Sequence, residues 1–262
     1  YVHTSVNAVD VEGSRPRVIL SVCLTGYGSA TKLAELIEER LPELRQQGVE
    51  TLCMDINLSS KTEADIQRLV GDRQIVAIVG TINPRLENYP FLSLTEVLFG
   101  DGISRLRTLL GNTLIDPMLL QRASIQTVPT TPTFSQRSDL LREISYTLSQ
   151  RMLFLNPMRA LPLIESMIEL IEVEVGETFE LEVLAGFVLH IACILEYGHQ
   201  QPAILVNETV RQRIEQQFPR ELSICRHALQ VLSSQVARPL PDEEAYNIVG
   251  ILRQVDIFFG QE

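Results

Sequence analysis

Apolar runs and amphipathic stretches alternate over the first 110 residues of the chain. The apolar runs predict strands at 18–22, 49–54 and 75–79, followed by a brief fourth strand at 91–93. Stretches with apolar residues at helical spacing predict helices at 33–41, 62–70 and 94–110, the second of them beginning at a Thr cap. Such alternation is typical of a small parallel sheet with helices on both faces.

The second half of the chain carries helical spacing and no convincing strand pattern. Apolar residues recur every three or four positions over 161–171, while 181–195 is apolar nearly all round, as a central buried helix would be. Further helices are expected at 214–218, 222–232 and 244–259. We therefore expect a small parallel-sheet (Rossmann-like) α/β domain followed by an all-α bundle of about five helices.

The stretch between the two halves changes character. Residues 111–139 include Pro117 and the proline- and threonine-rich run 128–134, without a sustained period. The expected division is an unstructured start at 1–15, an α/β domain at 16–112, a linker at 113–145 and a helical bundle at 146–262. The linker is expected to be partly structured near 118–120. Because the first residue is Tyr1 rather than Met, we expect a piece of a longer polypeptide.

Charge and composition narrow the class of function. The net charge of −11, with nine arginines, no lysine and seventeen acidic residues in 141–262, opposes nucleic-acid binding and favours a protein partner. No apolar stretch approaches the roughly 20 residues of a membrane span. The four cysteines are far apart and form no C-x-x-C pair, which indicates reduced thiols in a cytoplasmic protein.

A loop rich in glycine and hydroxyl groups follows the first predicted strand, beginning at Cys23. Its backbone N–H groups and the following helix N-terminus would cradle a phosphate and lower the pKa of a thiol at its rim. Thr81 and Asn83, after the third strand, are expected to complete the wall as secondary contacts. The cradle itself comprises Leu24, Thr25, Gly26, Tyr27, Gly28, Ser29 and Ala30.

The residues alone leave three other interpretations of this loop open. Cys23 could be a buried strand-end thiol beside an ordinary turn. Gly26-x-Gly28 after a strand also fits dinucleotide binding, although Thr31 replaces the third glycine. A cysteine phosphatase would need an arginine six residues after the nucleophile, and Ser29 occupies that position. Without the arginine, a phosphocysteine is more easily formed than hydrolysed.

The loop nevertheless resembles a known phosphorylation loop. Cys-Leu-Thr-Gly-Tyr-Gly-Ser-Ala at 23–30 is similar to that of the galactitol-type enzyme IIB domains of the bacterial sugar phosphotransferase system. Ala-Ile-Val-Gly-Thr-Ile-Asn-Pro at 77–84, followed by Pro90, Phe91 and Leu94, resembles the version found in sigma-54-dependent regulators of the levanase-operon type. The resemblance covers about 17–110 and implies that Cys23 is the phosphorylated residue.

His190 lies in the most apolar predicted helix, where desolvation makes a histidine unfavourable without a partner. A core histidine with one hydrogen bond is the ordinary explanation, and it stays open. The other histidines are weaker candidates: His227 is expected to be solvated, His199 lies in a loop and His3 near the start. No pair of residues has convincing metal-ligand spacing, so neither a metal nor a cofactor is expected.

The helical half resembles the phosphotransferase-system regulation domain, in which a helix bearing His-x-x-x-x-x-Glu carries a phosphorylatable histidine. His190 and Glu196 have this spacing, and 155–157 and 241–246 also resemble the copy in levanase-type regulators. Tyr197 stands where the family often has arginine. The second family histidine falls near 250–251, where this chain has none, so one phosphosite is expected. The match spans about 146–257.

Together the resemblances imply a regulatory fragment of a sigma-54-dependent transcription activator, which is not itself an enzyme. Phosphoryl groups on Cys23 and His190, donated by HPr or a sugar-specific enzyme IIB, would report sugar availability. Other expected partners are the ATPase and DNA-binding domains preceding Tyr1, and a homodimer through the helical domain is an open option. The alternatives are an enzyme IIB transport component that passes phosphate from Cys23 to a sugar, and a purely structural interaction module.

Overall fold

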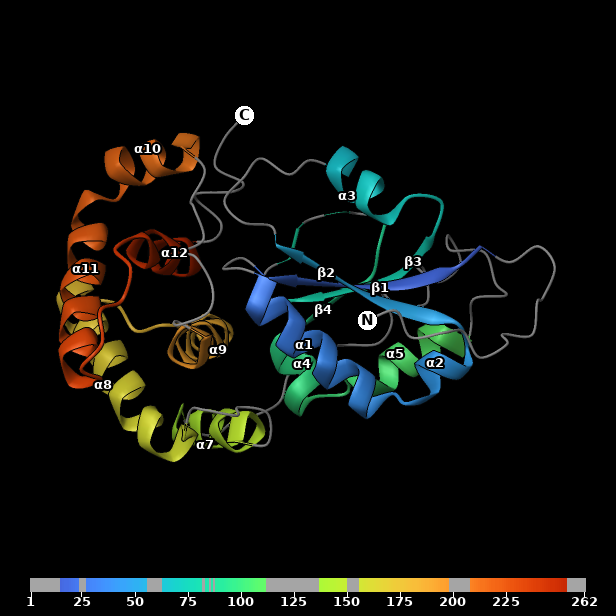
Figure 1. Cartoon of the computed structure of the whole chain (residues 1–262), viewed down its shortest axis with the longest axis horizontal. Coiled ribbons are helices and arrows are strands. Elements are labelled where there is room, and N and C mark those ends of the chain that lie inside the picture. Colours follow the sequence, from blue (N-terminus) through green and yellow to red (C-terminus); the bar gives the residue numbers. More distant parts are fainter. Residues whose placement is uncertain are drawn as a thin grey trace.

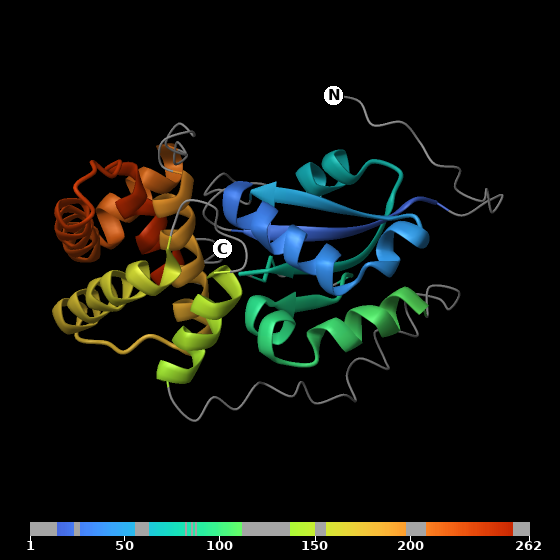
Figure 2. The ribbon, with the colours of Figure 1, turned by 60° about the horizontal axis from the view of Figure 1, so that its bottom comes forward.

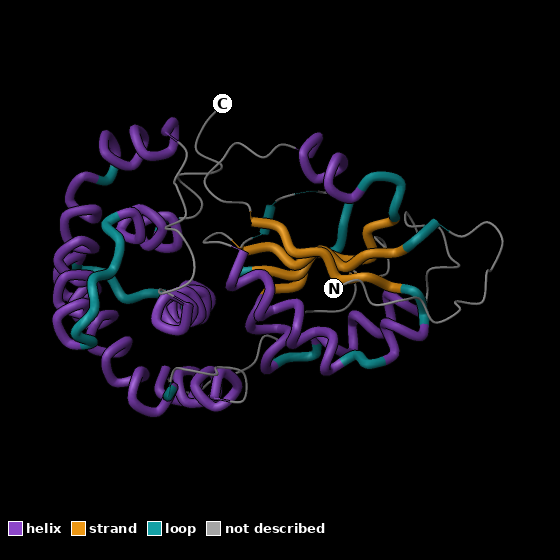
Figure 3. The backbone as a smooth tube through the Cα atoms, viewed as in Figure 1, coloured by secondary structure: helices purple, strands orange, loops and turns teal. Residues whose placement is uncertain are grey.

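The computed structural model of the chain comprises an α/β part and a helical part (Figure 1). It describes residues 15–23, 27–55, 63–81, 83–84, 86, 88–111, 137–149, 156–197 and 208–253. Figure 3 shows the strands gathered in one part, while the other is built from helices. The expected fold class is therefore confirmed.

The sheet of the α/β part has four parallel strands in the order β2-β1-β3-β4. Their bounds are β1 Arg17–Cys23, β2 Val49–Asp55, β3 Gln74–Gly80 and β4 Phe91–Ser93. All four predicted strands are present. β1 and β3 are buried almost throughout because neighbouring strands and helices cover them. At the carboxyl edge, Cys23 pairs with Asp55 and Val22 pairs with Gly80.

Helices cover both faces of this sheet, as predicted. They are α1 Tyr27–Arg40, α2 Glu43–Gln46, α3 Glu63–Val70, α4 Leu94–Phe99 and α5 Gly102–Gly111. In Figure 1, α3 lies on the opposite side of the sheet from α1, α4 and α5. The Thr cap predicted at the start of α3 lies outside the described residues.

The single helix predicted over 94–110 is wrong, because the chain forms two helices there. Ser93 caps the start of α4: its hydroxyl accepts from the Glu96 N–H, while the Glu96 carboxylate accepts from the Ser93 N–H. It ends at Gly100, whose backbone is extended. A Cβ on Gly102 would lie 2.7 Å from the Glu96 carbonyl carbon, so glycine lets α5 start close against α4.

The helical part is arranged around α9. Its helices are α7 Arg137–Ser149, α8 Pro157–Val175, α9 Leu181–Tyr197, α10 Glu208–Gln217, α11 Pro219–Gln235 and α12 Glu243–Leu252. α9 packs on α7, α8 and α12 and is buried along most of its length, as predicted for the central helix. Within the described residues, no helix combines the length and the apolar character needed to cross a membrane.

α7 corrects the expected linker. Residues 137–145, assigned to the linker from the sequence, are helical, and Leu140, Leu141, Ile144 and Leu148 are buried at helical spacing. The proline-rich run at 128–134 led to a predicted start of the helical part at 146, which is later than the start of α7 at Arg137. The rest of the linker, including 118–120, lies outside the described residues, as do 254–259 of the last predicted helix.

The two parts meet through α9, which packs on α1 and α4 of the α/β part. Figure 2 shows the helical part beside one end of the sheet. Arg40 at the end of α1 donates to the carbonyls of Val97 and Leu98 in α4, at 3.0 and 2.9 Å, which ties these two helices together. The surface that α9 contacts is therefore formed by two helices, α1 and α4, whose relative position is fixed by these hydrogen bonds.

Candidate functional site

Cys23 is the last residue of β1, and Thr81 lies beside it at the end of β3. The Thr81 N–H donates to the Val22 carbonyl at 3.2 Å, which continues the β1–β3 pairing by one residue. The Thr81 hydroxyl then reaches the Cys23 sulfur, to which it donates at 3.5 Å. The expected meeting of Cys23 and Thr81 at one sheet edge is thus confirmed.

Gly80 makes this approach possible. A Cβ on Gly80 would lie 2.3 Å from the Val22 carbonyl oxygen, far inside the contact distance of real side chains. The glycine before Thr81 therefore lets β3 pass close to β1 where the thiol is held.

The start of α1 lies directly after the Cys23 strand. α1 begins at Tyr27, and the Ser21 hydroxyl of β1 donates to the Ala30 carbonyl at 2.8 Å. Ser29 and Ala30 are buried. Asn83 is exposed. Leu24, Thr25 and Gly26 lie outside the described residues, so the phosphate cradle stays a prediction.

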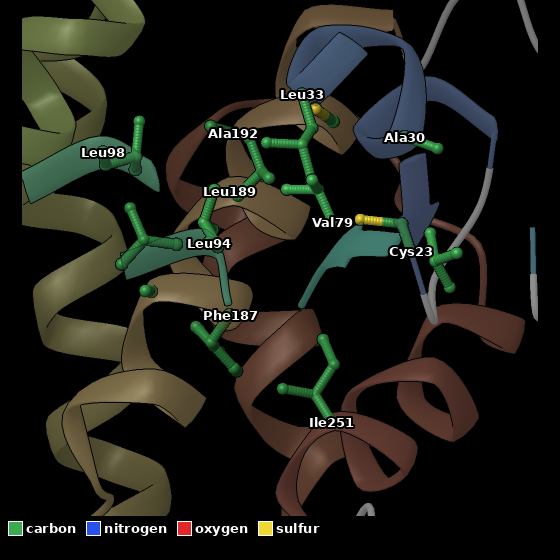
Figure 4. Packing of buried hydrophobic residues seen from close by; sticks show 14 of the residues in the cluster. Cys23, Ala30, Leu33, Val79, Leu94, Leu98, Phe187, Leu189, Ala192 and Ile251 are labelled. Carbon is green, nitrogen blue, oxygen red and sulfur yellow. The ribbon is translucent and has the colours of Figure 1, made fainter. Parts of the chain in front are cut away.

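The Cys23 side chain has no exposed surface. Figure 4 shows it in one apolar cluster with Ala30 and Leu33 of α1, Val79 of β3 and Leu189 of α9. Because the thiol is fully buried, the interpretation of Cys23 as a strand-end thiol beside an ordinary turn stays open. The cover of the thiol comes from packing between residues far apart in the chain.

The other cysteines are free thiols without an activating environment. Burial raises the pKa of Cys193 to about 11 and that of Cys225 to about 12. Cys53 is half-buried, and burial raises the pKa of its thiol as well. A raised pKa lowers the fraction of the reactive thiolate near neutrality.

His190 lies on α9 and faces α12. Its Nε2 is 3.1 Å from a carboxylate oxygen of Glu244, and the two side chains are only 2% and 8% exposed. The ring nitrogen and the carboxylate approach closely, without the alignment of a full hydrogen bond. The Asn247 side-chain amide donates to the same Glu244 oxygen at 2.8 Å.

This environment keeps Glu244 ionised. Burial by itself would raise the pKa of its carboxyl group, but interaction with His190 and the Asn247 hydrogen bond outweigh burial and hold that pKa below its ordinary value. A buried negative charge therefore lies beside the imidazole. His190 is buried, so the interpretation as a core histidine with one partner stays open.

Sequence reasoning assigned no role to Glu244. One signal was available: Glu244 stands next to the apolar positions Ala245, Ile248 and Val249 of α12, where a buried carboxylate needs a partner. Glu196, expected near the phosphosite, is buried six residues after His190, and its role stays a prediction.

The remaining histidines do not join this site. His227 is exposed, as predicted, and lies 3.1 Å from Glu174. His3 and His199 lie outside the described residues. Among the described residues, no cluster of three or more His, Cys, Asp or Glu side chains is arranged to hold a metal ion.

Comparison with known proteins gives two kinds of match. Residues 165–254 match the family model of the PRD domain. The transcriptional regulatory protein DagR of Salmonella typhimurium is 25% identical over 235 residues, which cover 88% of this chain and 23% of that protein. The transcriptional regulatory protein LevR of Bacillus subtilis is 21% identical over 241 residues, 92% of this chain and 24% of that protein.

The chain thus spans about a quarter of the length of these two relatives. No solved structure matches it. The PRD match includes His190 and Glu244, the buried pair between α9 and α12. Residues 165–254 are thus similar to a PRD domain, and both relatives are named as transcriptional regulatory proteins.

Proposed function

We propose that this chain is the phospho-acceptor part of a sigma-54-dependent transcription activator, and that it senses the sugar phosphotransferase system through Cys23 and His190. The observation that carries the proposal is the PRD match over 165–254, which contains His190. The α/β part adds support, because Cys23 ends a central strand beside the start of α1 and a hydroxyl donor from Thr81. The relatives DagR and LevR are named as transcriptional regulatory proteins.

The chemistry at Cys23 is transfer of a phosphoryl group from a phosphohistidine or phosphocysteine donor. The thiol first loses its proton to solvent, and the sulfur then attacks the phosphorus. A sulfur–phosphorus bond forms while the donor's bond to phosphorus breaks and its nitrogen or sulfur keeps the electron pair. The Thr81 hydroxyl, which donates to the sulfur, would stabilise the thiolate.

At His190 the lone pair of one ring nitrogen attacks the phosphorus of the donor. A nitrogen–phosphorus bond forms, the donor's bond breaks, and any proton on the attacking nitrogen leaves to solvent. The product adds up to two negative charges beside the Glu244 carboxylate, which is itself buried and ionised. Like charges at this distance repel strongly, so phosphorylation would separate α9 from α12 and repack the helical part.

The donors that fit this chemistry are HPr and a sugar-specific enzyme IIB, acting in the cytoplasm. Each acceptor would hold its phosphate as a signal rather than pass it to a sugar, so this part of the protein is not an enzyme. The ATPase and DNA-binding functions would reside in the remainder of the full-length regulator.

Intact-mass measurement of the full chain tests the proposal. The chain is incubated with phosphoenolpyruvate, enzyme I, HPr and a panel of enzyme IIB proteins, whose own phosphorylation is verified first. We expect two phosphoryl additions, one lost in Cys23→Ser and the other in His190→Ala. Cys53→Ser and His227→Ala are matched controls that should retain both. Equal labelling of the parent and both acceptor variants would contradict the assignment, and no labelling from any charged donor would favour a structural role.

A further inference from the structure

One face of α9 is directed at the α/β part. The positions 182, 186, 189 and 193 follow each other at intervals of three and four residues and so share one side of the helix. Glu182 accepts hydrogen bonds from the hydroxyls of Ser93, at 3.0 Å, and Thr95. Leu189 lines a small apolar cavity with Leu33 of α1 and Leu94 of α4.

These contacts extend to the surroundings of Cys23. A Cβ added to Gly186 would meet the Cβ of Thr81 at 3.6 Å, and Thr81 is the residue that donates to the Cys23 sulfur. α9 also packs on α1, which supplies Ala30 and Leu33 to the apolar cluster around Cys23. α9 therefore contacts both segments that flank Cys23, and the Cys23 thiol has no exposed surface.

We propose that α9 is an autoinhibitory cover over Cys23: the docked helical part withholds the thiol from any protein phosphoryl donor, and it must separate from α1 and α4 before transfer. The inference rests on the proposed function only for the identity of the reaction that is withheld. Cover of the thiol by α9 is a separate physical claim that ordinary thiol reagents test.

Physical chemistry favours separation in the phosphorylated state. Leu33, Val79 and Ala30 lie in the apolar cluster around Cys23, whose sulfur also accepts from the Thr81 hydroxyl. A phosphoryl group with up to two negative charges cannot remain in such surroundings without compensation. The docked and phosphorylated states therefore exclude each other, and phosphate on Cys23 would hold α9 away.

Substitution of Gly186 tests the cover. In Gly186→Ala the new Cβ makes ordinary contact with Thr81, whereas the larger side chain of Gly186→Leu collides with it and wedges the two parts apart. Each variant and the parent, as the full chain, are treated with N-ethylmaleimide, and peptide mass spectrometry gives a rate for every cysteine. Cys225, buried in α11, reports whether the helical part stays folded.

We expect Cys23 and Cys193 to react about tenfold faster or more in Gly186→Leu, because the lost packing shifts the opening equilibrium. Cys225 should remain slow, and Gly186→Ala should match the parent. Faster reaction of Cys193 with Cys23 still protected would overturn the proposal, since the thiol would then be covered by its own part alone. Glu182→Lys removes the contacts with Ser93 and Thr95 and gives a second opened variant. If the alkylation rates of Cys23 and Cys193 are unchanged in both Gly186→Leu and Glu182→Lys, the proposal is overturned as well.

If alkylation of Cys225 is faster in Gly186→Leu, that substitution has disturbed the helical part itself. Glu182→Lys then takes its place, and the rates of Cys23 and Cys193 in Glu182→Lys are compared with those of the parent. The phosphorylation rate of Cys23 by charged donors separates the two proposals. Faster alkylation in the opened variant without phosphorylation by any donor supports the cover and contradicts the proposed function. Equal phosphorylation rates in the parent and the opened variant contradict the cover and leave the phospho-acceptor role standing.

Discussion

The imidazole of His190 lies 3.1 Å from the carboxylate of Glu244, and both side chains are buried between α9 and α12. The pair joins α9, the most apolar of the described helices, to α12, the last of them. A donor protein cannot reach His190 in this arrangement, so phosphorylation at this position requires the pair to open. A phosphate on His190 would thus act on the rest of the helical part through repulsion of the Glu244 carboxylate.

Glu244→Ala should destabilise the helical part. It leaves the buried His190 ring without its partner, and we expect a loss of about 1–3 kcal/mol in the free energy of unfolding. Urea denaturation followed by circular dichroism measures the change. Glu243→Ala is the matched control: this neighbour is 33% exposed and lies 3.8 Å from Arg211, so its loss should be within about 0.5 kcal/mol. Equal losses in the two variants would show that the His190 contact has no special role.

The Glu244 carboxyl should also make stability fall in acid. Its pKa in the folded protein is below the ordinary 4.5 because the His190 and Asn247 interactions outweigh burial. The unfolded chain therefore binds this proton more readily, so the contribution is present above pH 4.5 and is lost as the pH falls through the lowered value. The difference in unfolding free energy between parent and Glu244→Gln should shrink below that pH. A constant difference would contradict the pairing.

Glu182 should show the opposite dependence. Burial against α4 raises the pKa of its carboxyl above 4.5, although the Thr95 and Ser93 hydroxyls partly oppose that shift. The folded chain then holds this proton more tightly, so the contribution is present below pH 4.5 and is lost as the pH rises through the raised value. Glu182→Gln, which is neutral throughout, should gain stability relative to the parent over this range. A relative loss would show that the ionised carboxylate stabilises the interface.

Gly80→Ala should disturb the Cys23 site through the backbone. The new Cβ would lie 2.3 Å from the Val22 carbonyl oxygen, so β1 and β3 must shift at the strand end. We expect a loss of about 1–3 kcal/mol or more, as for overpacked cores. Gly111→Ala, at the end of α5, meets nothing within 4 Å and should leave stability nearly unchanged. Thermal unfolding of the two variants makes the comparison, and a tolerated Gly80→Ala would contradict the close approach.

The sequence pattern predicted the strands well because β1 and β3 are covered on both faces and must be apolar throughout. One helix was predicted over 94–110 instead of α4 and α5. The break between them depends on the close approach of Gly102 to the Glu96 backbone, which cannot be seen in the spacing of apolar residues. No helix was predicted at α7, because residues 137–145 follow the proline-rich run and were assigned to the linker, although Leu140, Leu141 and Ile144 have helical spacing.

The site was predictable where it depends on strand order. Parallel strands bring their carboxyl ends to one edge, and so Thr81 was expected beside Cys23. The packing of α9 on α1 and α4 and the pairing of His190 with Glu244 were not predicted, because both depend on the docking of segments distant in sequence. The His-x-x-x-x-x-Glu motif identified His190 as a candidate, but it gave no indication of Glu244, its partner on α12.

Phosphorus NMR of the fully phosphorylated chain tests the two-acceptor proposal most directly, because phosphorus bonded to sulfur and phosphorus bonded to an imidazole nitrogen resonate in well-separated regions. The chain is charged by phosphoenolpyruvate, enzyme I, HPr and an enzyme IIB, freed of the donors and recorded beside Cys23→Ser and His190→Ala. We expect one phosphocysteine and one phosphohistidine signal in the parent, with each variant lacking only its own. Signals that survive both substitutions, or a spectrum without either signal when the donors themselves are charged, would contradict phosphorylation of Cys23 and His190.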